Sequence, residues 1–247
     1  MRDFLMDVIK HIPTAKIDTM LVTCDTDGTL VQGCDDDRSF FIQARLNPFL
    51  PDFEGRFGLT NISLLNGLLN FANFQTEDAT LTAKIAERPQ GKILEELHFR
   101  NPRTGNSTDF RLMSPDNVTP PARINEVNWE VEVTPSKEKV AEFGQLASMF
   151  ADVDKNFVVR TTEDGNLLFM IGDESASTHR VSMIFAEGVE GNVRGDQPFT
   201  AAQFLMVMKL VSSHKDVRLS VSNLGVLCIS VETSFGHYAY YMRANIQ

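Results

Sequence analysis

Apolar residues recur at helical spacing in four places, and each is followed by segments that alternate as strands do. The last place is the clearest, because Phe204, Val207, Met208 and Val211 fall on one face of a helix. Thr200 with Gln203 predicts a capping box at the start of this helix. Three strands are then predicted from alternation, a short apolar run and aromatic enrichment, at residues 217–222, 226–231 and 237–243.

The same pattern predicts three earlier helices. They cover residues 2–12, residues 60 or 61 to about 73, and a segment capped by Thr134 with Pro135 in its first turn. Strands are predicted at residues 19–24, 30–33, 39–46, 79–85, 93–99, 109–113, 129–133, 156–161, 167–171 and 179–186. Residues 49–57 and 188–197 are predicted to be irregular.

A helix followed by three strands therefore occurs about four times, and the two halves of the chain correspond at an offset of roughly 140 residues. The turns Asp27-Gly28 and Asp164-Gly165 occupy matching places in the two halves. This order predicts an α+β fold of two similar domains, each with two helices packed on mostly antiparallel sheets. We expect domains at residues 1–113 and 125–247, joined by a proline-containing connector at 114–124.

Composition limits the functions that this fold can serve. The chain has 247 residues, 43% of them hydrophobic, but its apolar runs are shorter than the roughly 20 residues that span a bilayer, so no membrane partner is expected. Cys24, Cys34 and Cys228 lack metal spacing, which indicates buried thiols in a reducing cytoplasm. A net charge of -10 argues against tight binding of free nucleic acid by bulk electrostatics.

The element order resembles that of the DNA sliding clamps, the processivity factors of replicative DNA polymerases. Residues 235–242, Phe-Gly-His-Tyr-Ala-Tyr-Tyr-Met, are similar to the last strand of PCNA-type clamps. Residues 53–73 and the connector at 115–121 are closer to clamps of large tailed bacteriophages. The resemblance implies a homotrimeric ring of six domains that encircles duplex DNA, is opened by an ATP-dependent clamp loader, and is not itself an enzyme. No cofactor and no metal are expected.

The resemblance also implies which residues face DNA. A ring holds DNA by topology, so its inner helices need only lysines and neutral amides that do not repel phosphate. Asp3, Asp7, Glu138 and Glu142 on the same helices indicate a less basic bore than is usual, and the candidates are equally compatible with ordinary solvated helix faces. The candidates are Arg2, Lys10, Asn66, Asn70, Lys137, Lys139, Gln145, Lys209 and Lys215.

Two further surfaces are implied in the same way. Partner proteins of clamps insert a hydrophobic motif beside the connector and the C-terminus, which here gives Met113, Val118, Pro120, Ala244 and Ile246. The subunit seam is formed by edge-to-edge strand pairing. This predicts Phe110 and Leu112 of one subunit facing Val181, Met183 and Phe185 of the next. Each of these residues could instead pack only within its own domain.

A second family resemblance suggests an enzyme. An apolar strand followed by Asp25-Thr26-Asp27-Gly28 resembles the first motif of the haloacid-dehalogenase-type phosphatases, in which Asp25 would be the nucleophile, Asp27 the general acid/base, and Mg²⁺ the cofactor. That chemistry requires a parallel sheet with helices between strands, whereas this motif lies between two closely spaced strands. Asp164-Gly165 occupies the same place in the second half without the first aspartate, so we expect a hairpin turn.

Overall fold

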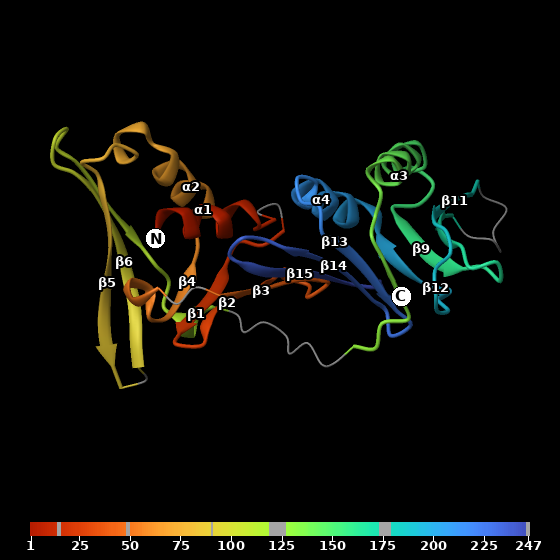
Figure 1. Cartoon of the computed structure of the whole chain (residues 1–247), viewed down its shortest axis with the longest axis horizontal. Helices are drawn as coiled ribbons and strands as arrows, with labels where there is room; N and C mark the ends of the chain where they lie inside the picture. Colours follow the sequence, from red (N-terminus) through yellow and green to blue (C-terminus); the bar gives the residue numbers. More distant parts are fainter. Residues whose placement is uncertain (14–15, 48–49, 90, 119–126, 173–178, 246–247) are drawn as a thin grey trace. The chain divides into compact units, whose positions relative to one another are not determined.

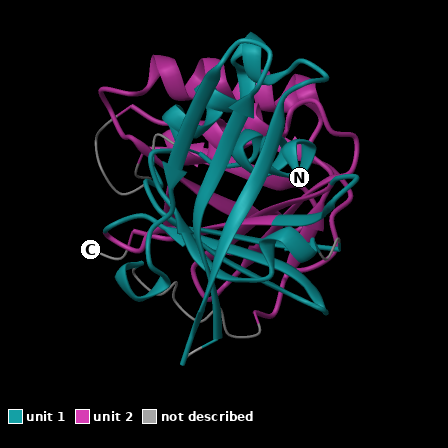
Figure 2. Cartoon of the chain, turned by 90° about the vertical axis from the view of Figure 1, so that its left-hand side faces the viewer, with its two compact units in different colours: residues 1–36, 41–122, 233–238 teal, residues 37–40, 123–232, 239–247 magenta. Residues whose placement is uncertain are grey.

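A computed structural model describes residues 1–13, 16–47, 50–89, 91–118, 127–172 and 179–245. Within this part the protein is α+β, with four α-helices and fifteen strands arranged in two sheets (Figure 1). The pairing is mostly antiparallel, as predicted, and β4 with β6 is the parallel pair. The chain divides into two compact units, coloured in Figure 2: residues 1–36, 41–122 and 233–238 in unit 1, and residues 37–40, 123–232 and 239–247 in unit 2.

Unit 1 is a sheet with strand order β5-β6-β4-β1-β2-β3, in which β7 also pairs with β6. Helices α1 and α2 lie together on one side of it (Figure 1). Its elements are α1 (Arg2–Lys10), β1 (Met20–Asp25), β2 (Gly28–Cys34), β3 (Phe40–Leu46), β4 (Gly55–Leu59), α2 (Ile62–Asn70), β5 (Thr80–Arg88), β6 (Gly91–Asn101) and β7 (Asn106–Arg111).

Unit 2 has two strand sets, β8-β13-β14-β15 and β11-β10-β9-β12. Its elements are β8 (Val131–Val133), α3 (Lys137–Met149), β9 (Asn156–Thr161), β10 (Leu167–Ile171), β11 (Val181–Ala186), β12 (Arg194–Thr200), α4 (Ala201–Val211), β13 (Val217–Ser222), β14 (Val226–Glu232) and β15 (Gly236–Arg243).

The two units share one element order. A helix, four strands, a second helix and three strands run from α1 to β7, and the same series runs from α3 to β15. The sheet order repeats as well, because β4-β1-β2-β3 in unit 1 corresponds to β12-β9-β10-β11 in unit 2. The repeated helix followed by three strands is therefore confirmed, with an additional strand ahead of α2 and of α4.

The predicted apolar stripes form the cores. In unit 1, α1 buries Phe4, Leu5, Val8 and Ile9. In unit 2 the core is aromatic: Phe143 of α3 lies edge-on to Phe169 and Phe204, with ring centroids 5.1 Å and 5.5 Å away. Burial of such rings removes a large apolar area from water, which makes this cluster the main support of the helices that carry the candidate site.

Several local predictions are wrong. The segments predicted to be irregular, 49–57 and 188–197, contain the first residues of the strands β4 and β12. Helix α3 is capped by Ser136 rather than Thr134, because the Ser136 hydroxyl accepts a hydrogen bond of 3.1 Å from the Lys139 amide. The capping box at Thr200 does not form: the Gln203 amide is buried and donates to the hydroxyl of Ser39 at 3.1 Å.

Candidate nucleic-acid interface

Three of the predicted DNA-facing lysines line one groove of unit 2. Lys137 is the first residue of α3, Lys209 lies in the last turn of α4, and Lys215 follows that helix. They surround a depression of about 650 Å³ whose lining includes no acidic residue. In a chain of net charge -10, this concentrates positive potential at one place on the surface.

The floor of this groove is apolar. Val140 of α3 and Leu205 and Met208 of α4 line it. His214 lines it as well and was missed by the sequence analysis, although the helical period of α4 continues toward it. Lysine side chains can lay their aliphatic stems along an apolar floor while their ammonium groups stay in water.

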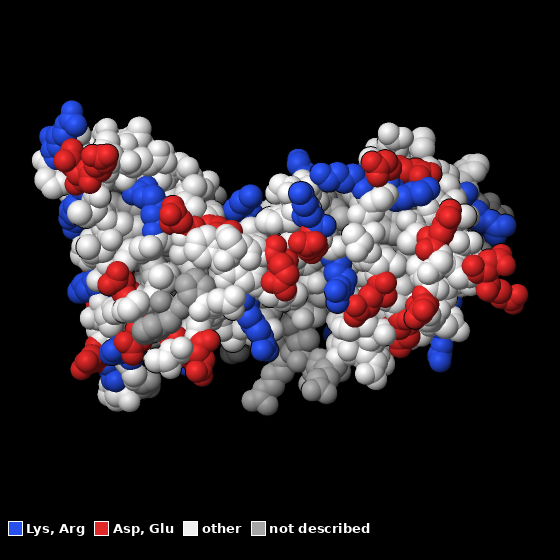
Figure 3. All heavy atoms as spheres, viewed as in Figure 1, with Lys and Arg blue, Asp and Glu red and all other residues white. Residues whose placement is uncertain are grey.

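Of the two other candidates on α3, Lys139 is partly neutralised and Gln145 is uncharged. The ammonium group of Lys139 donates to the carboxylate of Glu142 at 2.9 Å. Gln145 is exposed one turn further along the helix. Figure 3 shows basic side chains over α4 and α3 with acidic side chains beside them on α3, so this face is mixed and only the groove itself lacks acids.

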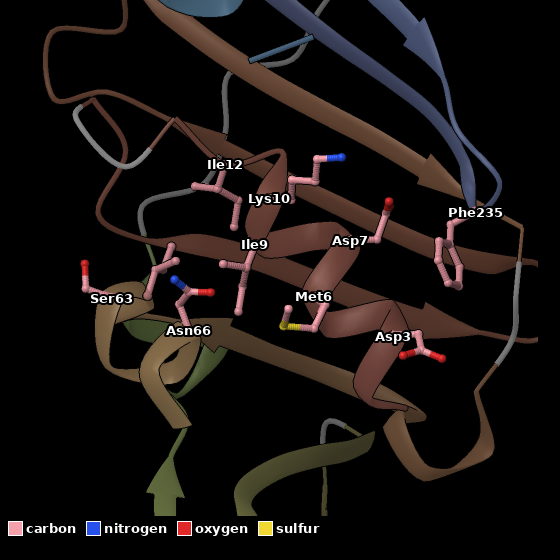
Figure 4. A pocket seen from close by; sticks show the side chains of 10 residues that line it. Asp3, Met6, Asp7, Ile9, Lys10, Ile12, Ser63, Asn66 and Phe235 are labelled. Carbon is pink, nitrogen blue, oxygen red and sulfur yellow. The ribbon is translucent and has the colours of Figure 1, made fainter. Parts of the chain in front are cut away.

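A second groove, of about 650 Å³, lies between α1 and α2 of unit 1 (Figure 4). Lys10 and Asn66 line it as predicted candidates, but Asp3 and Asp7 line it too. Helix α2 has no charged residue between Ile62 and Asn70. Unit 1 therefore presents a nearly neutral face, in which the Asn70 amide donates to the Asn66 side-chain oxygen at 2.9 Å.

Arg2 has a role inside unit 1. Its guanidinium donates to the backbone carbonyl of Leu69 at 2.6 Å and also to that of Phe74. Leu69 lies in the last turn of α2, and Phe74 is the last residue of the short 3-10 helix Ala72–Phe74, so both carbonyls are at helix ends where helical partners are missing. Burial lowers the pKa of Arg2, against the opposing effect of Asp3. The side chain thus ties α1 to the end of α2, and this contact was not predicted.

The candidate partner residues are divided between the units. Met113 exchanges two backbone hydrogen bonds with Gly58, of 2.9 Å and 2.8 Å, and Val118 is buried against the same strand. A Cβ atom at Gly58 would lie 2.5 Å from Val118, so glycine allows this close approach. In unit 2, Ala244 is buried and donates its amide to the Gly225 carbonyl. Pro120 and Ile246 lie outside the described residues.

The predicted seam residues lie on two edge strands, except Leu112, which directly follows β7. Among the described strands, β7 pairs only with β6, and β11 pairs only with β10. The side chains of Phe110, Met183 and Phe185 are buried in their own units, and Phe185 stacks on Phe169 with centroids 3.9 Å apart. Leu112 and Val181 are half-buried. These side chains support the strands, while the backbone edges are what a neighbouring strand could use.

The Asp25 segment is a hairpin. Strand β1 is antiparallel to both neighbours, β2 and β4, and Asp25 pairs with Gly28 across a two-residue turn. The Asp25 carboxylate accepts a hydrogen bond of 2.9 Å from the Asp27 amide, and Gly28 has a φ of 129°. A Cβ atom at Gly28 would lie 2.7 Å from the Leu46 carbonyl. Turn geometry thus accounts for each residue of this motif.

Two features are absent from the described residues. These residues contain no cluster of three or more histidine, cysteine, aspartate or glutamate side chains placed to hold a metal ion. None of the described helices combines the length and apolar character needed to cross a bilayer. Compared with known proteins, the chain matches no protein-family model and no curated protein.

Proposed function

We propose that this protein is a DNA sliding clamp, a processivity factor that encircles duplex DNA and tethers a replicative DNA polymerase. The observation that carries the proposal is the repeat of one element order and one sheet order in the two units. Such duplication suits a closed ring, because similar domains can continue one another around an axis with similar contacts.

The edge strands support the proposed assembly. A head-to-tail ring needs two different complementary edges on each chain. Strands β7 and β11 each have one unpaired edge among the described residues, and they belong to different units. Pairing β7 of one copy with β11 of the next satisfies the backbone groups of both and gives a homotrimer of six domains.

The charge distribution supports weak contact with DNA. Lys137, Lys209 and Lys215 present cations around one groove, whereas the α1/α2 face has one exposed lysine and two aspartates. A few cations on a largely neutral surface attract the phosphate backbone without holding it at one position. Sliding depends on contacts of this strength, and retention is then supplied by the closed ring.

Two measurements test the proposal. Light scattering should give three times the chain mass of 27.7 kDa. After loading by a clamp loader and ATP, the protein should stay on circular DNA in high salt and leave when the circle is cut. A stable monomer at all concentrations, or retention that does not depend on an intact circle, would falsify the proposal.

A further inference from the structure

Strand β5 has an unusually open position for a strand of nine residues. None of its residues is buried, and Ile85 keeps 36% of its surface exposed. Among the described strands its only hydrogen-bonded neighbour is β6, so β5 ends the strand order of unit 1. An unpaired edge of this length presents a row of backbone donors and acceptors to solvent.

The corresponding strand of unit 2 is covered. Strand β13 follows α4 as β5 follows α2, and β8 pairs antiparallel with its other edge. Five of the six residues of β13 are buried. The repeat therefore contains one copy of this edge with an added strand and one copy without it.

The residues of the added strand β8 show which side chains are suited to a strand that pairs with this edge. Its residues alternate, with Val131 buried against the sheet and Glu132 exposed. Glu132 forms an ion pair of 3.2 Å with Arg218, which lies on the outer face of β13. The strand that adds to β13 therefore has an apolar residue on the buried face and an acid next to a basic residue on the exposed face.

Strand β5 offers the same two faces. Leu81 and Ala83 lie opposite the buried residues Phe99 and Leu97 and so face the core. On the other face, Lys84 and Arg88 form ion pairs with Glu95 at 3.4 Å and 2.7 Å, and 54% of each basic side chain is exposed. Ion pairs this exposed are weak and can be shared with a further acid.

We propose that the free edge of β5 is a binding site for an extended segment of a partner protein in which apolar and acidic residues alternate. The segment adds to β5 as β8 adds to β13, with its acids next to Lys84 and Arg88. A second copy of β5 is disfavoured, because antiparallel pairing centred on Lys84 brings two ammonium groups together. The site uses neither the lysine groove nor the predicted seam, so it does not depend on ring formation.

The test uses the full chain and two synthetic peptides of nine residues, one alternating valine with glutamate and one alternating valine with lysine. The acidic peptide should slow hydrogen exchange of the backbone amides of residues 80–88, and the basic peptide should not. In the variant Lys84→Glu/Arg88→Glu the preference should reverse, with the acidic peptide binding roughly fivefold to tenfold more weakly. The control Lys16→Glu/Lys155→Glu changes the net charge equally at exposed positions that do not belong to β5 or β6 and should bind as the natural protein does.

The proposal fails if the acidic peptide leaves residues 80–88 unprotected, if both peptides bind equally, or if the control variant loses binding to the same extent. Protection that rises with protein concentration in the absence of peptide would assign the edge to a second copy instead and would also overturn it. Should the charge-reversal variant not fold, Lys84→Gln/Arg88→Gln replaces it, and the difference between the two peptides should then shrink.

Discussion

The hydroxyl group of Tyr238 donates a hydrogen bond of 2.7 Å to the Asp7 carboxylate. These residues are 231 positions apart in sequence and lie together in unit 1. Tyr238 also stacks on the buried ring of His11, with centroids 4.2 Å apart, and the His11 ring is 2.8 Å from the Asp7 carbonyl. The start of β15 thereby fixes the C-terminal half of α1, the helix that carries Lys10.

Replacing Tyr238 with phenylalanine should lower the free energy of unfolding by about 1.5–3 kcal/mol, the usual range for a hydrogen bond to a charged group. The ring and its packing on His11 are kept, so the loss reports the hydroxyl group. Chemical denaturation measures it. In a double-mutant cycle with Asp7→Ala, which removes the acceptor, the two losses should not add. Simple additivity would show that the bond contributes nothing to stability.

The lysine groove makes a prediction about salt. Changing Lys137, Lys209 and Lys215 to glutamine removes three cations from one place while keeping the length of each side chain similar. If each neutralises one phosphate, the slope of log affinity against log salt should become less steep by up to about 2.7. Anisotropy measurements on a linear duplex would determine it. Lys139→Gln is the matched control, because Glu142 already neutralises Lys139. An unchanged slope in the triple variant would separate the groove from DNA binding.

Ile184 provides a test of the proposed seam. It lies on the edge strand β11, and 37% of its surface is exposed. An aspartate there should break the trimer into folded monomers, because pairing at this edge would hold the charge beside the cross-strand side chains of the next subunit and partly remove it from water. Light scattering reports the mass, and circular dichroism reports the fold. The control Leu224→Asp changes a turn residue that is 70% exposed, and it should remain trimeric. A trimeric Ile184→Asp variant would place the seam elsewhere.

For the Asp25 motif we predict that a substitution has little effect. Asparagine at this position still accepts the hydrogen bond from the Asp27 amide, so Asp25→Asn should be nearly as stable as the natural protein. Asp25→Ala loses the acceptor and should cost about 0.5–1 kcal/mol. Neither change should matter to catalysis if the motif is only a turn. Hydrolysis of a phosphomonoester with Mg²⁺ that disappears in Asp25→Asn would restore the phosphatase hypothesis.

Sequence reasoning located the hairpin turns and the buried faces of the helices, although the caps predicted at Thr134 and Thr200 did not form. The Asp27-Gly28 signal marks a hairpin, but Thr26 and Asp27 form its two-residue turn and Gly28 begins β2 with a φ of 129°. In the second half, residues 162–166 join β9 to β10, and Gly165 has a φ of 75° within this longer turn. The apolar stripes of the helices were likewise sufficient, because burial of one face requires nothing beyond the helical period.

The missed strands lack such signals. Strand β4 contains Gly55 and Gly58, and β12 contains Pro198, all of which are typical of loops. Tertiary contacts override this preference: β4 pairs with β1 on one side and β6 on the other, and β12 accommodates Pro198 beside a register shift. A tertiary contact also overrides the local signal at Gln203, whose side chain bonds to Ser39, 164 residues away, and not to the start of its own helix.

Part of the candidate site was also beyond sequence reasoning. The spacing of Lys137 and Lys209 on separate helices does not reveal that they share a groove, because that depends on how α3 packs beside α4. Arg2 was grouped with them by charge, yet carbonyl groups of Leu69 and Phe74 hold it. Only the folded chain distinguishes a cation that is available to phosphate from one that is used internally.

Burial of Cys228 predicts how stability depends on alkaline pH. Burial raises the pKa of this thiol from 9.0 to about 12, although a hydrogen bond with the backbone of Tyr240 opposes the shift. Above pH 9.0 the unfolded chain loses the proton while the folded chain keeps it. Unfolding therefore becomes easier as pH rises toward about 12, by up to about 1.4 kcal/mol per pH unit.

The variant Cys228→Ala separates this effect from packing. Loss of the sulfur leaves a small cavity whose cost does not change with pH, so the variant should be less stable at neutral pH. The difference in free energy of unfolding between the two proteins should then narrow between pH 9.0 and about 12, because only the natural protein has the Cys228 thiol, which keeps its proton when folded and loses it when unfolded. Urea denaturation across that range measures the difference. A difference that stays constant would mean that the thiol ionises alike in the folded and unfolded chains.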